Sequence, residues 1–123
     1  MNEETIVKRI LNSAFNVHKQ LGPGLLESAY ESCLYFELQS IGLKVERQKP
    51  LPLIYNEIKL EAGYRVDLLV ESKIVVEVKA VDAIADIHIA QVLTYLKLSG
   101  CKLGLLLNFN TLLLKHGIKR LIN

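Results

Sequence analysis

A β-hairpin between Gly63 and Ala80 is the feature that most constrains the fold of this chain. Along both arms apolar side chains alternate with others, which is the pattern of strands with one buried face. The apolar face carries Tyr64, Val66, Leu68, Val70, Ile74, Val76, Val78 and Ala80. The opposite face is apolar near the turn and charged at its far end, where it carries Arg65, Asp67, Glu77 and Lys79. We therefore expect one face to lie on a core and the other to gather charges.

The register of this hairpin decides whether its charges meet. A three-residue loop at residues 71–73 pairs Val70 with Ile74. Counting back along the arms, Asp67 then lies opposite Glu77 on the same face, with Cβ atoms ~5 Å apart. A two-residue loop would separate the two carboxylates, because a one-residue slip inverts a strand. We expect the three-residue loop, since it also keeps the other face purely apolar.

Two neighbouring carboxylates repel each other unless a cation lies between them. Lys79 is one pleat along the strand, at ~7 Å, and a divalent metal ion would offset the remaining repulsion. The alternative is a solvated strand face with mixed charges, since antiparallel sheets often leave one side wet. The hairpin alone leaves both interpretations open.

Length and composition predict a single globular domain over residues 1–123, with half of the residues hydrophobic. The net charge of +2 neither requires nor excludes a nucleic-acid partner. Cys33 and Cys101 lack zinc-ligand spacing and are expected to be buried thiols of an intracellular protein. The first ten residues do not resemble a signal peptide, and the apolar stretches are too short to span a membrane. We therefore expect a cytoplasmic protein.

Helices and further strands complete the predicted fold. Periodicity and capping signals predict helices from the Asn2 cap to a Gly-Pro-Gly turn, from about residue 25 to 41 and from about 84 to 99. Residues 43–55 contain two prolines and predict an edge strand, and residues 102–108 predict a strand buried within a sheet. The third helix connects this strand to the strand of Lys79, so the two strands should run parallel.

Two of the predicted helices carry polar faces. Glu27 and Glu31 share a face of the second helix, although a glutamate in a first turn is ordinarily a partner of the helix dipole. Gln91 and Tyr95 share a face of the third helix, apart from its apolar stripe. His88 lies on that same face, where we expect it to pack or cap rather than to catalyse.

Taken together, these residues resemble the core of the PD-(D/E)XK nuclease superfamily. The pattern is Asp67, nine intervening residues, Glu77-Val-Lys79, then Gln91 and Tyr95 on the next helix. The spacing from Gln91 to Tyr95 is typical of the RecB-like branch. The resemblance implies an α/β restriction-endonuclease-like fold, in which a mixed sheet is flanked by helices in the order αβββαβ.

A closer resemblance lies in Gly24, Glu27 and Tyr30, which match the signature of the GxxExxY family of small bacterial and archaeal proteins. The segments GPGLLESAYE, GYRVDLLV, IHIAQ and LTYLKL also look like blocks of that family. One departure from restriction enzymes is Val66, which stands where those enzymes have proline before the aspartate. The wider superfamily tolerates this change.

The resemblance implies a metal-dependent deoxyribonuclease. Mg²⁺ or Mn²⁺ would be bound by Asp67, Glu77 and the carbonyl oxygen of Val78, since hard cations prefer oxygen ligands. Lys79 would orient or help to deprotonate the attacking water. Two further roles are implied on the helices: Glu27 would accept hydrogen bonds from metal-bound waters, and Gln91 with Tyr95 would orient the lysine.

Other functions stay open at this point. The same fold could act as a binding module for nucleic acid or a partner protein, with little catalysis of its own. The charges could also form a surface network in a structural dimer, without metal. A chain this short, with no separate recognition domain, favours low specificity or dependence on a partner, and a homodimer also stays open. Strandedness, sequence preference and the choice between end and internal cleavage are not indicated.

Overall fold

Helices and strands follow one another in the order that the sequence predicts. The computed structural model describes the backbone of residues 1–123 and every side chain except that of Ala62. The elements are α1 (Glu3–Leu21), α2 (Glu27–Ser40), β1 (Val45–Tyr55), β2 (Ile58–Val70), β3 (Ile74–Lys79), α3 (Asp86–Ser99), β4 (Leu103–Asn108), the 3₁₀ helix η1 (Leu114–Gly117) and β5 (Ile118–Ile122). The stretch from α2 to β4 is thus an αβββαβ unit.

The strands form one mixed sheet of five, in the order β1-β2-β3-β4-β5. β3 and β4 run parallel, as the crossover through α3 predicts, and the other neighbouring pairs are antiparallel. Val70 pairs with Ile74, which confirms the predicted hairpin register. β1 is an edge strand, also as predicted.

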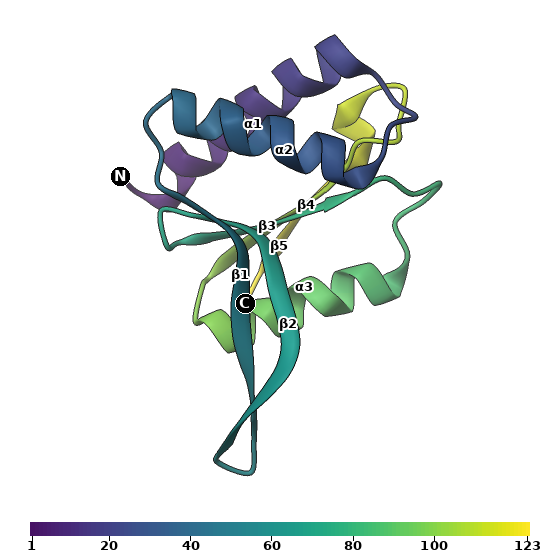
Figure 1. Ribbon diagram of the computed structural model, residues 1–123. Coiled ribbons are helices and arrows are strands. Elements are labelled where there is room, and N and C mark those ends of the chain that lie inside the picture. Colours follow the sequence, from purple (N-terminus) through teal and green to yellow (C-terminus); the bar gives the residue numbers. More distant parts are fainter.

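Helices cover both faces of the sheet, in one layer on each face (Figure 1). α1 and α2 pack on one face, where a core cluster joins Ile10 and Leu34 to strand residues such as Leu68 and Leu105. α3 packs on the other face through a second cluster that includes Leu96. β4 is buried along its whole length between the two layers, which explains why its sequence is almost continuously apolar.

The helix ends follow local capping chemistry. The Asn2 side chain accepts a hydrogen bond from the Thr5 N–H (2.9 Å), and Gly100 ends α3 with φ of 74°. A ring nitrogen of His88 accepts a hydrogen bond from the Ala85 N–H (3.0 Å). His88 is therefore a capping residue, as expected. Among the described residues, no helix is both long enough and apolar enough to cross a membrane.

β2 changes face part of the way along, which the alternation of its sequence does not predict. Leu68 packs toward α1 and α2, but Val66 belongs to the cluster under α3, and the Tyr64 ring meets α3 rather than the core with Leu68. The prediction of one continuous apolar face is wrong at these two residues. The break falls opposite Gln48 of β1, which has φ of 52° and is missing from the pairing with β2. The register shift of this strand pair lies further along, between Leu51 and Leu53.

The far ends of β1 and β2 form a two-stranded ribbon that projects past α3 (Figure 1). Its turn places Asn56 and Glu57 at φ of 48° and 67°, the geometry of a tight hairpin turn. Tyr55 and Ile58 face each other beside this turn, and both are exposed.

Candidate active site

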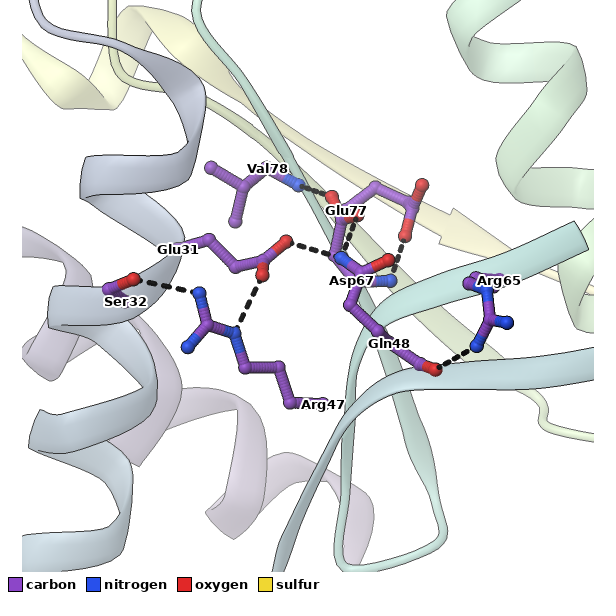
Figure 2. A network of polar contacts seen from close by, with 8 residues as sticks. All are labelled: Glu31, Ser32, Arg47, Gln48, Arg65, Asp67, Glu77 and Val78. Atoms are coloured by element: carbon purple, nitrogen blue, oxygen red, sulfur yellow. Dashed lines mark hydrogen bonds and ion pairs between the residues drawn. The ribbon is translucent and has the colours of Figure 1, made fainter.

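The carboxylates of Asp67 and Glu77 lie where β2 and β3 separate. The regular pairing of the two strands ends at Leu68 and Val76. Beyond it, the Asp67 N–H donates to Oε2 of Glu77 (2.7 Å), and the Val78 N–H donates to Oδ2 of Asp67 (2.8 Å) (Figure 2). Each carboxylate is therefore held in place by the main chain of the opposite strand.

Burial changes the ionisation of this pair. Glu77 is only 2% exposed, and burial raises the pKa of its carboxyl to about 8, with the negative charge of Asp67 adding to the rise. Burial also raises the pKa of Asp67 to about 6, and the charges of Glu31 and Glu27 add to it. Without a cation, the pair therefore holds a proton up to a higher pH than two separate carboxyl groups would.

Lys79 continues the site from the end of β3. Its Nζ donates to Oε1 of Gln91 (3.3 Å), and Nε2 of Gln91 donates to the Tyr95 hydroxyl (3.1 Å). Burial raises the pKa of the Tyr95 hydroxyl, and the charges of Glu77 and Asp67 add to this, so the hydroxyl stays neutral. The polar face of α3 therefore meets Lys79 in one pocket, as expected from the spacing of Gln91 and Tyr95.

Glu27 approaches the carboxylates of Asp67 and Glu77 from the face of the sheet that α2 covers, opposite to α3. It is the first residue of α2, it is exposed, and it lines a shallow pocket together with Asp67 and Glu31. Its charge helps to raise the pKa of Asp67. The structure thus brings all of the predicted site residues to one region, from α2, β2, β3 and α3.

Three residues of this region were not predicted as members of the site. Glu31 is buried and accepts hydrogen bonds from Nε of Arg47 and Nε2 of Gln48, both at 2.8 Å. Gln48 also donates to Oδ1 of Asp67 (3.2 Å), and Arg47 donates to Ser32 (2.7 Å) (Figure 2). These hydrogen bonds connect β1 to α2, and the bond from Gln48 fixes the orientation of the Asp67 side chain. The position of Glu31, four residues after Glu27, was the available sequence signal.

Tyr30 acts on the turn between α1 and α2. Its hydroxyl donates to the Gly22 carbonyl (2.6 Å) and accepts from the Leu25 N–H (3.1 Å), while its ring stacks on Phe109 with centroids 4.8 Å apart. The turn therefore has a fixed shape just before α2 begins. That shape determines where Glu27 lies.

The donor set suits a hard divalent cation that keeps part of its water shell. Among the side chains that the structure describes, no cluster of three or more His, Cys, Asp or Glu forms a complete ligand set. Mg²⁺ is commonly held by only one or two carboxylates together with substrate phosphates. The raised pKa values of Asp67 and Glu77 reflect an electrostatic cost that such a cation would remove. The residues present therefore fit Mg²⁺ or Mn²⁺.

An αβββαβ core whose second and third strands separate around an Asp and a Glu-x-Lys defines the restriction-endonuclease-like class of α/β proteins. The family model described as the PD-(D/E)XK nuclease superfamily matches residues 4–121. The chain therefore belongs to the PD-(D/E)XK nuclease superfamily. No curated protein and no solved structure matches the chain significantly.

Proposed function

We propose that this protein is a metal-dependent nuclease that hydrolyses phosphodiester bonds of DNA, and that within its superfamily it is a member of the GxxExxY group. The observation that carries the proposal is the carboxylate pair at the strand separation, with Lys79 beside it. Carboxyl groups with raised pKa values next to a pocket favour a functional site over a surface charge, and here Asp67 lines a pocket while Glu77 lies buried beside it.

In the proposed site Asp67, Glu77 and the carbonyl oxygen of Val78 hold Mg²⁺ or Mn²⁺. A bound divalent ion supplies a more acidic water and positive charge for the phosphoryl oxygens. The main-chain N–H groups of Asp67 and Val78 donate to the carboxylates of Glu77 and Asp67 and keep both in one orientation before substrate binds. The protein therefore does not need to reorganise these two groups during the reaction.

The remaining site residues act on water and on the phosphate. The Lys79 ammonium group offsets phosphate charge and orients the attacking water, while Gln91 and Tyr95 restrict the rotamers of Lys79 through their hydrogen bonds. Glu27 accepts hydrogen bonds from waters at the mouth of the site, a role that its exposure allows.

DNA cleavage tests the proposal directly. Circular and linear DNA are incubated with the protein in Mg²⁺ or Mn²⁺, in EDTA, and with the Lys79→Ala variant. We expect cleavage with metal only, and a rate about 10²- to 10⁴-fold lower in Lys79→Ala, the usual range for losing a charge-stabilising or proton-transfer group. Lys59→Ala is the matched control, because this exposed lysine lies on the projecting ribbon.

Cleavage that is equally fast in EDTA or in Lys79→Ala would contradict the proposed mechanism. DNA binding without metal-dependent cleavage would instead support the alternative function, a nuclease-fold binding module.

A further inference from the structure

The pocket that contains Lys79, Gln91 and Tyr95 opens between α3 and β2. Its volume is about 430 Å³, which lies within the range of small-ligand sites, roughly 300–1,000 Å³. Tyr64 and Ile87 line this pocket together with Lys79, Gln91 and Tyr95. It is therefore continuous with the proposed catalytic groups rather than separate from them.

The walls of this pocket are aromatic and apolar, yet they face solvent. Tyr64 is 41% exposed and meets the buried Tyr95 ring edge-on, with centroids 6.3 Å apart. Ile87, in the first turn of α3, is 72% exposed. Gln91 and Thr94 add amide and hydroxyl groups to the same pocket. A flat ligand with polar edges matches this mixture of an aromatic face and hydrogen-bonding groups.

The charges on the two sides of the site differ in sign. The shallow pocket next to Asp67 is also lined by Glu27 and Glu31, whose negative charges are offset only in part by Arg47. Of the described residues that line the pocket beside Lys79, none is an aspartate or glutamate. A phosphate can therefore lie against Lys79 while the uncharged part of the same nucleotide enters the aromatic pocket.

Resting on the proposed function, we propose that this pocket binds an unpaired nucleobase next to the scissile phosphate, with Tyr64 as the stacking surface. Inside a duplex both faces of a base are covered by neighbouring bases, so a base can lie against Tyr64 only when it is unstacked. The substrate is therefore DNA with an unpaired nucleotide at the site: a single strand, a flap or a frayed end.

Binding, measured apart from cleavage, tests this inference. All variants carry Asp67→Asn, which should abolish cleavage and lies outside the lining of the pocket. Anisotropy is recorded in Mg²⁺ with one labelled oligonucleotide, alone or annealed to its complement. We expect the single strand to bind at least ~5-fold more tightly than the blunt duplex. Tyr64→Ala should weaken single-strand binding by about 5- to 100-fold, the range for losing one stacked base, and leave duplex binding unchanged.

Tyr55→Ala is the matched control, because this tyrosine is exposed as well but lies at the end of β1, next to the turn to β2. It should leave both affinities unchanged. Tyr64→Leu keeps apolar bulk beside Tyr95 without a stacking ring, so it should behave like Tyr64→Ala while its melting curve stays close to that of the parent. This second variant separates lost stacking from lost folding.

Three results would overturn the pocket assignment: equal affinity for single strand and duplex, a loss in Tyr64→Ala no larger than in Tyr55→Ala, or no binding of either DNA. The proposed hydrolysis fails on a different result. Preferential binding of the single strand, with no metal-dependent cleavage by the wild-type protein, would refute hydrolysis and leave the pocket assignment standing.

Discussion

Two carboxyl groups determine the chemistry of this molecule at the scale of the residue. Asp67 and Glu77 each lose water on folding and gain a like charge as neighbour, which disfavours their ionised forms. The hydrogen bonds that they accept from main-chain N–H groups offset only part of this cost. A carboxyl whose pKa is higher in the folded state binds more protons folded than unfolded. Its contribution to stability is therefore lost as pH rises from the unfolded pKa, near 4, toward the folded one.

The first prediction follows from this loss of stability at high pH. Glu77→Gln removes the charge but keeps an oxygen that can accept the Asp67 N–H. We expect its melting temperature to match the wild type within a few degrees at pH 5 and to exceed it by about 3–10 °C at pH 8.5, both without metal. Melting curves at several pH values in EDTA measure this difference. Glu61→Gln, an exposed control on β2, should show no such dependence.

A Glu77→Gln curve that stays parallel to the wild type from pH 5 to 8.5 would contradict the raised pKa of Glu77. It would also remove the electrostatic argument for a cation at this position.

The second prediction concerns how Lys79 is held. Tyr95→Phe keeps the buried ring but removes the hydroxyl that accepts from Gln91. We expect kcat to fall about 3- to 30-fold with KM little changed, because a looser Gln91 holds the Lys79 ammonium less well. Kinetics of DNA cleavage measure both constants. Gln91→Ala should have a similar effect, and the double variant should be little worse than either single one, since all three act as a unit.

If the effects of Tyr95→Phe and Gln91→Ala simply multiply, the two residues act independently and the hydrogen-bonded chain to Lys79 has no role in turnover.

At the scale of the element, the site depends on where α2 starts. The Tyr30 hydroxyl forms hydrogen bonds with Gly22 and Leu25 in the turn before α2, and its ring stacks on Phe109 in the core. This gives a structural reason for the tyrosine that follows Glu27 by three residues. Glu27 is placed by the helix, and the helix is placed by Tyr30.

The third prediction tests that dependence. Tyr30→Phe leaves the Leu25 N–H and the Gly22 carbonyl without their partner and should lower the free energy of unfolding by about 1–3 kcal/mol. Urea denaturation measures the loss. Cleavage should also slow, but no more than in Glu27→Ala, because Tyr30 acts only through Glu27. A larger loss of activity than in Glu27→Ala, with stability unchanged, would show that the hydroxyl itself touches substrate.

The elements differ in how far the sequence predicts them. The register around Val70 and Ile74 could be predicted, because only one loop length keeps the apolar residues next to the turn on the same face. The change of face at Val66 could not be predicted, since it breaks the alternation of the sequence opposite Gln48, a non-glycine residue with positive φ. Contacts of Gln48 with Glu31 and Asp67 join segments far apart in the chain and leave no local pattern.

At the scale of the whole molecule, the site joins the two layers. α2 brings Glu27 and Glu31 from one face of the sheet, and α3 brings Gln91 and Tyr95 from the other. The carboxylate pair lies between them, at the point where β2 changes face. If the proposed cation binds there, it would stabilise the packing of both layers and not only the ends of two strands.

The last prediction uses this position. Mg²⁺ or Mn²⁺ binds the assembled site and not the dispersed carboxylates of the unfolded chain, so it should raise the melting temperature. At about 100 times its dissociation constant the gain is about 2.7 kcal/mol, or roughly 10 °C for a domain of this size. The shift should be full at pH 8.5 and should largely disappear at pH 5, because protons compete for Asp67 and Glu77 below their raised pKa values.

Asp67→Asn supplies the decisive comparison. It should abolish both cleavage and the metal-dependent shift, while its metal-free melting temperature at pH 8.5 should be no lower than that of the wild type, because the repulsion with Glu77 is relieved. A functional site has this combination of lost activity and retained stability, whereas a structural ion pair has the opposite one. If Asp67→Asn unfolds the metal-free protein at much lower temperature, and divalent ions leave the wild-type melting curve unmoved, the carboxylates serve the fold and the nuclease assignment is wrong.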